Sequence, residues 1–306
     1  MQRVSFDIVV PHYGNGEVLK RMFDSLSKIE QFVGPKRIVV VENGPKLNGE
    51  QVCNQYSFLP IDYVYTEVAG LSNARNCGIK KTNSDFVIFF DNDIGFSKVT
   101  FTAYQSAFNE YGQNYFYGGP VTPVYSKKPP NWMLRYVPPS VKGFNLGDNN
   151  FITDNSLFLG GNHALSRRAI NSSLKTTGMV YEGESATGET GGGVGEEHRL
   201  QSRLIKNGFK GCYVAEANVY HPVKDECLTH NWICNRRYRR GITDANNQNM
   251  MAARLQFRGI PIWVVKRYIV CGFLEITFKT INPERAVFWG VQRAWAKGVI
   301  DGMLRR

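Results

Sequence analysis

Apolar runs of strand length alternate with segments of helical spacing over the first 95 residues. The apolar runs occupy residues 6–10, 37–41, 61–65 and 86–90. Between them, residues 17–28 and 71–81 place apolar side chains three and four positions apart, the spacing of one helix face. Parallel strands need a long crossover connection, which is usually a helix. This alternation therefore predicts an α/β fold with a doubly wound, mostly parallel sheet.

Further along, predicted elements are separated by long polar segments. Helices are predicted at 101–111 and 196–207, and a strand at 213–220 that ends at His221. Residues 126–150, rich in proline, glycine and asparagine, predict a long structureless segment of the kind that is usually functional or mobile. Residues 182–195 form a second such segment and contain six glycines.

The positive charge of the chain is concentrated at its end. Of the net +11, residues 231–306 carry +10 from fourteen Lys and Arg against four Asp and Glu, which leaves +1 for the first 230 residues. A basic tail on a near-neutral body indicates contact with an anionic surface, either membrane or nucleic acid. With 306 residues, 42% of them hydrophobic, the chain can bury one large domain or one domain with an appendage.

The tail contains one strongly apolar segment, residues 262–281, interrupted by Lys266, Arg267, Glu275 and Lys279. A membrane-spanning helix needs about 20 mostly apolar residues, so we expect no span here. The segment fits an amphipathic helix at an anionic membrane surface. Packing against the rest of the protein or against a second subunit is the alternative.

The cysteines and the start of the chain indicate an intracellular protein. The six cysteines are scattered without CxxC pairs, which argues against zinc ribbons and a disulfide framework and favours a reducing compartment. Residues 1–7 lead directly into an apolar run without a long hydrophobic leader, so we expect no signal peptide.

Two carboxylates one residue apart, Asp91 and Asp93, directly follow the apolar run 86–90. A buried parallel strand delivers its next residues to the carboxyl edge of the sheet, where open α/β folds bind their ligands. Close carboxylates repel each other unless a cation or ligand hydroxyls hold them. Their oxygens suit Mg²⁺ or Mn²⁺, which in turn suits a diphosphate. A solvated turn after the strand is the alternative for these residues alone.

Polar side chains also follow three other predicted strands: His12 and Tyr13, Glu42 and Asn43, and His221. Since the carboxyl ends of parallel strands share one edge, we expect them to converge on one ligand. His221 is a candidate further ligand for an ion held by Asp93, because imidazole suits Mn²⁺ better than Mg²⁺. A half-buried structural histidine is the alternative.

Six short motifs in order make the chain similar to the family 2 glycosyltransferases over roughly residues 4–240. They are Val9-Val10-Pro11-His12-Tyr13, Val39-Val40-Val41-Glu42-Asn43-Gly44, Gly70-Leu71-Ser72-Asn73-Ala74-Arg75-Asn76, Asp91-Asn92-Asp93, Gly160-Gly161-Asn162 and Gly195-Glu196-Glu197-His198-Arg199-Leu200. The resemblance implies the GT-A nucleotide-diphospho-sugar transferase fold. It implies a catalytic domain at 1–230, with a nucleotide-binding half at about 1–95 and an acceptor-side half at about 96–230, and a basic, amphipathic helical extension at 231–306.

The resemblance also implies how a nucleotide sugar binds. Pro11, His12 and Tyr13 would line the base pocket, and Glu42 stands where the family usually has an Asp that contacts the base. Asn43 would help to bind the nucleotide sugar. Arg75 would lie near the base or the diphosphate, and Asp91 would reach the ribose or a metal-bound water. Asn92 would help to bind the nucleotide sugar, and Gly161 and Asn162 would lie beside the transferred sugar. Asp93, His221 and Asp91 would hold Mn²⁺ or Mg²⁺. The glycine-rich segment 182–195 would order over the bound donor.

An inverting transfer needs a general base opposite the diphosphate. By resemblance this base is Glu197, while Glu196 orients its neighbours or touches the acceptor. The alternative for both is that acids in a first helical turn complement the helix dipole. The basic run at 236–240 would grasp phosphates or form a solvated helix face.

The expected activity is an inverting, metal-dependent transfer from a nucleotide-diphosphate sugar, with a UDP-sugar favoured, to a hydroxyl of a glycan or polyprenol-linked acceptor. Such a step belongs to surface polysaccharide or glycoconjugate synthesis, in the cytoplasm or peripherally on the inner face of the cell membrane. A sugar nucleotidyltransferase is the rival enzyme, but residues 11–16 lack its usual basic loop. A nucleic-acid-binding protein is disfavoured because the basic excess lies in a hydrophobic tail. An inactive binding module on the same fold is the third alternative.

Overall fold

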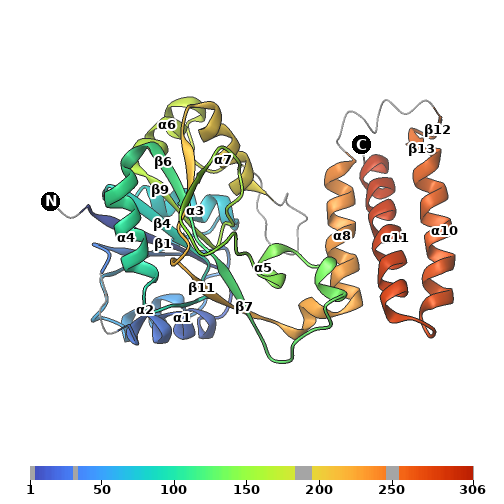
Figure 1. Cartoon of the computed structure of the whole chain (residues 1–306), viewed down its shortest axis with the longest axis horizontal. Coiled ribbons are helices and arrows are strands. Elements are labelled where there is room, and N and C mark those ends of the chain that lie inside the picture. Colours follow the sequence, from blue (N-terminus) through green and yellow to red (C-terminus); the bar gives the residue numbers. More distant parts are fainter. Residues whose placement is uncertain (1–3, 30–33, 183–194, 246–254, 306) are drawn as a thin grey trace. The chain divides into compact units, whose positions relative to one another are not determined.

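A computed structural model describes residues 4–29, 34–182, 195–245 and 255–305 of the chain (Figure 1). The chain forms two compact units. The sheet unit comprises Met1–Val124 and Gly143–Pro222, and the helical unit comprises Tyr125–Lys142 and Val223–Arg306. The boundary after Pro222 lies eight residues before the expected one at 230/231, and the segment Tyr125–Lys142 also belongs to the helical unit. The roles expected for 1–230 and 231–306 stay predictions.

The sheet unit is built on an eight-stranded sheet in the order β3-β2-β1-β4-β9-β6-β10-β8. Its strands are β1 (Phe6–His12), β2 (Ile38–Asn43), β3 (Ile61–Thr66), β4 (Phe86–Phe90), β6 (Tyr115–Gly118), β8 (Phe151–Thr153), β9 (Asn162–Ser166) and β10 (Lys210–Tyr213). The strand β9 runs antiparallel to β4 and β6, and β8 runs antiparallel to β10, whereas the other pairs are parallel. The predicted doubly wound, mostly parallel sheet is confirmed.

Helices cover both faces of this sheet (Figure 1). They are α1 (Glu17–Ser27), α2 (Gly49–Gln55), α3 (Leu71–Ile79), α4 (Thr100–Tyr111), α6 (Arg167–Thr177) and α7 (Glu196–Lys206). The helices predicted at 17–28, 71–81, 101–111 and 196–207 are confirmed to within about two residues, whereas α2 and α6 were not predicted. Gly78 brings α3 close to the sheet, since a Cβ there would lie 2.4 Å from Cγ1 of Val9.

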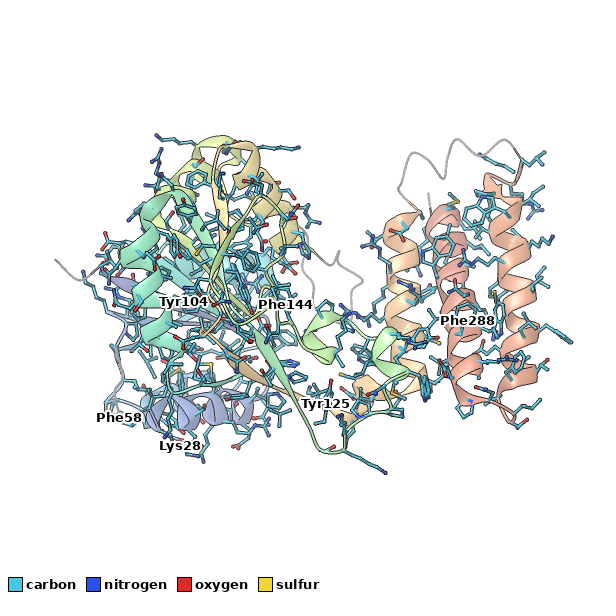
Figure 2. All side chains as sticks on the ribbon, in the orientation of Figure 1. Lys28, Phe58, Tyr104, Tyr125, Phe144 and Phe288 are labelled. Atoms are coloured by element: carbon cyan, nitrogen blue, oxygen red, sulfur yellow. The ribbon has the colours of Figure 1, made fainter. Side chains whose placement is uncertain are left out.

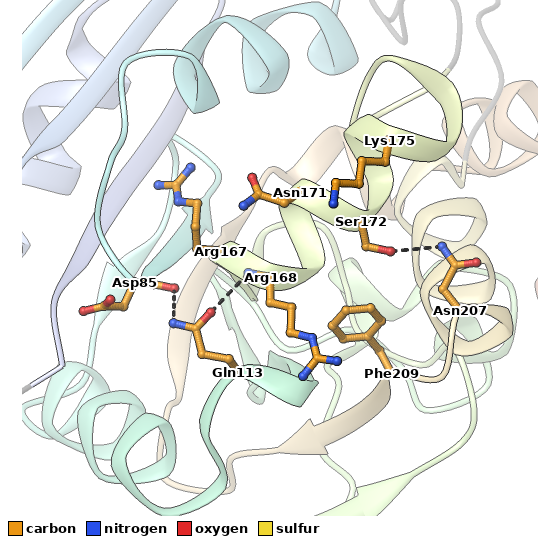
Figure 3. Close-up of a pocket in the computed structure, with 9 residues that line it drawn as sticks. All are labelled: Asp85, Gln113, Arg167, Arg168, Asn171, Ser172, Lys175, Asn207 and Phe209. Atoms are coloured by element: carbon orange, nitrogen blue, oxygen red, sulfur yellow. Dashed lines mark hydrogen bonds between the residues drawn. The ribbon is translucent and has the colours of Figure 1, made fainter.

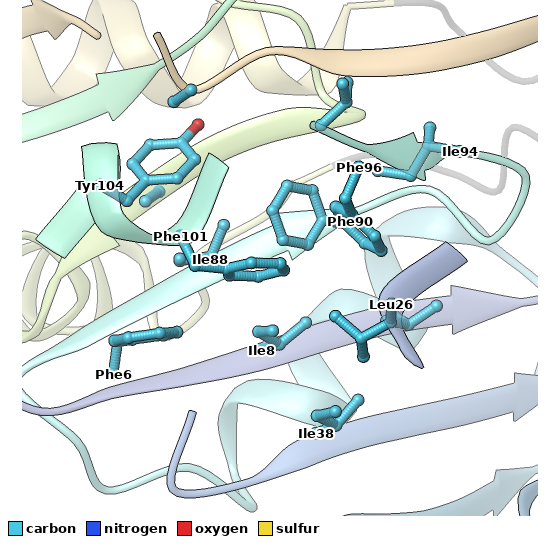
Figure 4. Packing of buried hydrophobic residues seen from close by; sticks show 14 of the residues in the cluster. Phe6, Ile8, Leu26, Ile38, Ile88, Phe90, Ile94, Phe96, Phe101 and Tyr104 are labelled. Carbon is cyan, nitrogen blue, oxygen red and sulfur yellow. The ribbon is translucent and has the colours of Figure 1, made fainter. Parts of the chain in front are cut away.

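Apolar side chains fill both sides of the sheet. Along β1, Ile8 and Val10 belong to one buried cluster and Val9 to the other, because successive strand residues point to opposite faces. This is why the central strands are continuously apolar rather than alternating. Figure 4 shows the first cluster, where Phe90 and Phe101 meet at a ring-centroid distance of 5.9 Å. Tyr104 lies inside the same unit, fully buried (Figure 2).

Two predictions about the middle of the chain were wrong. Residues 213–220 are not one strand: β10 ends at Tyr213, and after a turn β11 (Val219–Val223) joins a three-stranded sheet with β5 (Gly95–Phe96) and β7 (Val121–Tyr125). The turn is closed by the bond from the N–H of Ala217 to the carbonyl of Val214. Residues 126–150 are not structureless, since they contain a 3₁₀ turn (Met133–Arg135) and α5 (Pro139–Lys142).

The helical unit consists mainly of α8 (His230–Asp244), α10 (Ile262–Phe278) and α11 (Pro283–Leu304), with α11 packed against both other helices. A 3₁₀ turn (Asp225–Leu228) and the short strands β12 (Gln256–Phe257) and β13 (Ile260–Pro261) complete it. Glycines bring α8 and α11 together, since a Cβ on Gly298 would lie 2.0 Å from the carbonyl oxygen of Tyr238. Within the described residues, no helix is both long enough and apolar enough to cross a membrane. The expected helical C-terminal region is confirmed.

Candidate functional site

The segment Asp91-Asn92-Asp93 lies where β4 ends, at the carboxyl edge of the sheet. Its three side chains have three different partners. Oδ1 of Asp91 lies 3.5 Å from a guanidinium nitrogen of Arg75, and Nδ2 of Asn92 lies 2.6 Å from Nδ1 of His12. Oδ2 of Asp93 lies 3.6 Å from Nε2 of His221. The ends of β1 and β4 therefore meet as expected, whereas His221 does not follow the end of a parallel strand: it lies within β11 (Val219–Val223) of the three-stranded sheet.

Asp93 and His221 are the residues of this edge that could hold a cation. Oδ1 of Asp93 is buried and has no hydrogen-bond partner within the described part of the chain. The carboxylate and imidazole are a donor set that suits Mn²⁺. Mg²⁺-type sites often use one or two carboxylates and complete their coordination with water and substrate phosphates. The pair therefore fits an ion that is held jointly with a diphosphate.

Asp91 does not complete a three-ligand cluster. Among the described residues, only His230, Cys234 and Glu275 of the helical unit bring three possible metal-binding atoms within 4.8 Å of one another. Burial raises the pKa of Asp91, Arg75 opposes this effect, and the carboxylate of Asp93 raises the pKa further. Asp91 is thus held by Arg75 beside a second carboxylate, and its role as a metal ligand stays a prediction.

Arg75 is the centre of a buried polar network. It is 1% exposed and donates to Oε1 of Glu196 at 2.9 Å and to the carbonyl of Gly160 at 2.9 Å. Its guanidinium also lies 5.2 Å from the ring centroid of Tyr181. Burial would lower the pKa of Arg75, but Tyr181, Asp91 and Glu196 together raise it, so the side chain stays charged. Arg75 therefore joins α3, the end of β4 and the start of α7.

The two acids at the start of α7 have different surroundings. Glu196 is buried and its carboxylate accepts from Arg75. Glu197 is only partly buried, and burial together with the neighbouring Glu196 raises its pKa. A carboxylate with a raised pKa is suited to accept a proton near neutral pH. The division of roles expected from the sequence, with Glu197 as the base and Glu196 as an orienting group, stays a prediction.

His163 and Tyr181 extend the Arg75 network and were not predicted. Nδ1 of His163 lies 2.9 Å from the carbonyl of Gly160, and its Nε2 lies 2.5 Å from the hydroxyl of Tyr181. Burial lowers the pKa of His163 well below its ordinary value, and Arg75 lowers it further, so the ring is neutral. Nδ1–H then donates to Gly160 while Nε2 accepts from Tyr181. The residues around His163 in the sequence give no sign of this pairing.

The residues expected to bind the nucleotide at the ends of β1 and β2 divide into exposed and buried ones. Tyr13 is about half exposed at the sheet edge, whereas Pro11 and His12 are buried in β1. Asn43 is buried; it donates to the carbonyl of His12 at 2.8 Å and accepts from the N–H of Gly70 at 2.8 Å. Asn43 therefore ties the end of β1 to the start of α3, which carries Arg75.

Glu42 is fully buried and bonded within the protein. Its Oε1 accepts from the N–H groups of Leu47 at 3.1 Å and Gly49 at 3.3 Å, and its Oε2 accepts from the hydroxyl of Tyr63. These bonds hold the start of α2 against β2 and β3. They give Glu42 a local structural role, and its expected contact with a nucleotide base stays a prediction.

Gly160 and Gly161 allow a close backbone approach, whereas Asn162 is a structural clamp. A Cβ on Gly161 would lie 2.4 Å from Oδ2 of Asp91. Asn162 is fully buried: it donates to the carbonyls of Pro120 at 2.9 Å and Ala217 at 2.8 Å and accepts from the hydroxyl of Tyr104 at 2.8 Å. Both N–H donors of this side chain are used within the protein, and its expected contact with a sugar stays a prediction. Residues 183–194, which include Glu184 and Glu189 and most of the expected lid, lie outside the described residues.

A separate basic cavity of about 560 Å³ lies at the opposite edge of the sheet (Figure 3). Three of its lining residues lie at the amino ends of strands: Asp85 directly before β4, Gln113 two residues before β6 and Phe209 directly before β10. Arg167 and Arg168, at the start of α6, also line it. Arg167 donates to the carbonyl of Ser84 at 3.0 Å. This cavity is therefore distinct from the candidate site at the carboxyl edge.

Comparison with known sequences identifies a family. The model described as glycosyl transferase family 2 matches residues 7–174. Glycosyltransferase GlyA of Streptococcus pneumoniae serotype 4 is 34% identical over 88 residues, which are 28% of this chain. The aligned region covers only 12% of that relative's length.

Two solved structures share the fold. The structure of S. aureus TarS 1–349 in complex with UDP-GlcNAc has a TM-score of 0.52 and 19% identity, and the match covers 90% of this chain and 73% of that one. The mannosyltransferase PcManGT from Pyrobaculum calidifontis, in complex with GDP-Man and Mn²⁺, has a TM-score of 0.56 and 13% identity, covering 100% of this chain and 89% of that one. At such identities the likeness concerns the fold alone, and the predicted GT-A fold is confirmed.

Proposed function

Because this chain belongs to glycosyl transferase family 2, we propose that it transfers a sugar from a nucleotide-diphosphate donor to a hydroxyl of a glycan or lipid-linked acceptor. The observation that carries the proposal is the meeting of Asp93, His221 and the Arg75 network at the carboxyl edge of the sheet. A UDP-sugar is the first donor to test.

The proposed chemistry is a single displacement with inversion. Glu197 takes the proton from the acceptor hydroxyl, whose oxygen attacks the anomeric carbon. The bond from that carbon to the diphosphate oxygen breaks, and the nucleoside diphosphate leaves with the electron pair. The raised pKa of Glu197 supports this role, because a stronger base is better matched to removing a hydroxyl proton.

Asp93 and His221 would hold Mn²⁺ or Mg²⁺, with Asp91 nearby. When bound, such an ion would neutralise negative charge on the leaving diphosphate. Arg75 keeps Asp91 and Glu196 in fixed positions, which orients the cation side and the base side of the site with respect to each other. Fixed polar groups lower the reorganisation needed at the moment of reaction.

A donor panel tests the proposal. Thermal shift and slow donor hydrolysis would be measured with several nucleotide sugars, with and without Mn²⁺, for the wild type, Asp93→Ala and the surface control Asp154→Ala. We expect one donor to stabilise the wild type and the control in the presence of Mn²⁺ and to be hydrolysed slowly, and both effects to be lost in Asp93→Ala. No response to any nucleotide sugar would refute the proposal. Pyrophosphate release from a sugar phosphate and a nucleoside triphosphate would identify the rival nucleotidyltransferase instead.

A further inference from the structure

One face of α10 exposes a stripe of large apolar side chains. Phe273 is 72% exposed and Ile276 is 71% exposed, and Ile262, Trp263, Ile269 and Val270 are also exposed. Residues 262, 269, 273 and 276 are separated by seven, four and three positions, which is the spacing of one side of a helix. A shallow apolar cavity of about 440 Å³ on this face is lined by Ile262, Val265, Lys266, Ile269 and Val270. Such a contiguous apolar face usually marks a binding surface.

The opposite side of α10 packs inside the helical unit. Val264 and Cys271 are buried, and α10 packs there against α11. Glu275, the helix's one acidic residue, lies 3.0 Å from a guanidinium nitrogen of Arg293 and 3.1 Å from Nε2 of His230. These contacts neutralise Glu275 within the helical unit.

The charge that remains on the outward side of α10 is positive. Lys266 lies within the exposed stripe, and Lys279 is exposed at the end of the helix. Arg267 is engaged inward, with its guanidinium 5.0 Å from the ring centroid of Trp295. The outward face therefore combines apolar side chains with lysines and carries no carboxylate from α10.

We propose that this face of α10 lies in the headgroup region of an anionic lipid bilayer. Phe273, Ile276 and Ile269 would enter the acyl-chain boundary, and Lys266 and Lys279 would meet lipid phosphates. Long lysine side chains can place their charge at the headgroups while their stems cover apolar surface. The positive face thus complements a negative bilayer surface.

A second copy of the chain fits this face less well. A two-fold symmetric interface would bring the same face against itself, and so lysines against lysines without a carboxylate from either α10. Like charges at an interface oppose association. The lipid surface satisfies both the apolar and the charged parts of the face.

This inference is independent of the proposed chemistry, because none of the residues it uses belongs to the sheet unit. If both hold, the two together favour the lipid-linked acceptors over soluble glycans. A protein that hydrolyses the donor but does not bind membranes would refute the membrane inference and leave the proposed function intact, and the reverse result would do the opposite.

The test is co-sedimentation of the full chain with vesicles of phosphatidylcholine, with and without phosphatidylglycerol. We expect binding to the anionic vesicles, weakened about tenfold or more in the double variant Phe273→Ser and Ile276→Ser. Lys266→Gln and Lys279→Gln should each weaken binding about fivefold, and only on anionic vesicles. Phe58→Ser is the matched control: Phe58 is 68% exposed on the sheet unit (Figure 2), and its replacement should leave binding unchanged.

Three results would overturn the proposal. The first is that the wild type remains in the supernatant with anionic vesicles. The second is that the double variant binds vesicles as tightly as the wild type and melts at the same temperature. The third is that neither protein binds vesicles, while sedimentation velocity shows a wild-type dimer that the double variant loses. That outcome would make the face an interface between two copies of the chain.

Discussion

A guanidinium nitrogen of Arg75 lies 2.9 Å from Oε1 of Glu196, although the two residues are 121 positions apart in the chain. Both side chains are buried, so the contact fixes the start of α7 against α3 with little competition from water. Asp91 shares the same guanidinium at 3.5 Å. Asp91 and Glu196, on two sides of the candidate site, therefore both depend on the guanidinium of Arg75.

Replacing Arg75 by Met should destabilise the protein strongly. The change leaves Glu196 buried without its cation, and breaking a buried pair in this way costs about 3–5 kcal/mol. Chemical denaturation measures the effect. Lys46→Met is the matched control, since Lys46 and Glu50 form an exposed pair at 3.0 Å and such pairs contribute about 0–1 kcal/mol. Equal losses in the two variants would contradict a central role for Arg75.

Glu197→Gln should abolish transfer while preserving the fold. Removal of a general base typically lowers the rate by about 10²–10⁴-fold. Because burial and Glu196 disfavour the charge on Glu197, the neutral amide should leave the melting temperature unchanged or higher at neutral pH. Single-turnover rates and thermal melts check both expectations. Glu110→Gln, at an exposed position of α4, should retain full activity.

The pH dependence should follow the raised pKa of Glu197. The base works only when deprotonated, so kcat/KM should fall as the pH drops through a pKa above the ordinary value of 4.5. The effect on stability has the opposite sign. Because the pKa of Glu197 is raised in the folded protein, folding favours the protonated carboxyl, and the free energy of unfolding should fall as the pH rises from the pKa of the unfolded chain through that of the folded protein. In Glu197→Gln this acidic limb should vanish from the residual activity. An acidic limb that persists unchanged would assign the proton transfer to another group.

Gly161→Ala should damage the site through Asp91. The added Cβ would lie 2.4 Å from Oδ2 of Asp91, so either the carboxylate or the loop must move. A displacement of about 1 Å can cost about 10²-fold in rate. Gly272→Ala is the control, because its Cβ would meet nothing closer than 3.4 Å and alanine favours a helix. Activity and thermal stability of both variants would be compared.

Asp93→Asn and His221→Gln should weaken the response to Mn²⁺. Each removes one proposed ligand, and even outer-shell changes at metal sites cost about 10–100-fold in affinity. We expect the Mn²⁺ concentration for half-maximal donor hydrolysis to rise by at least that factor. The exposed control Asp154→Asn should titrate like the wild type. Unchanged titrations in both site variants would remove this pair from the cation site.

Part of the frame of the site could be predicted from the sequence, because β1, β2 and β4 are marked locally by apolar runs. The run Phe86–Phe90 is continuously apolar and stops at Asp91, so the strand end is visible in the chain itself. The start of α7 is also marked, by two acids after a glycine. Such features depend only on neighbours in the sequence.

The contacts inside the site could not be predicted in the same way. Asn162 bonds to Pro120 and Ala217, and its partners are backbone carbonyls that leave no signal in a sequence. The division of residues 213–220 into two strands depends on the turn after β10, not on a change in apolar pattern. Burial of Arg75 likewise follows from α3 packing closely on β1 through Gly78, which is a property of the assembled fold.

The internal bonds of Glu42 have a consequence for how donor preference can evolve. A mutation at Glu42 loses three hydrogen bonds and must be compensated before any new specificity can be selected. Tyr13, at the same sheet edge, is half exposed and contributes little to the core. Of the residues predicted to bind the nucleotide sugar at the ends of β1 and β2, Tyr13 can therefore change at the least cost to stability, and we expect relatives with other donors to differ there while keeping an acid at position 42.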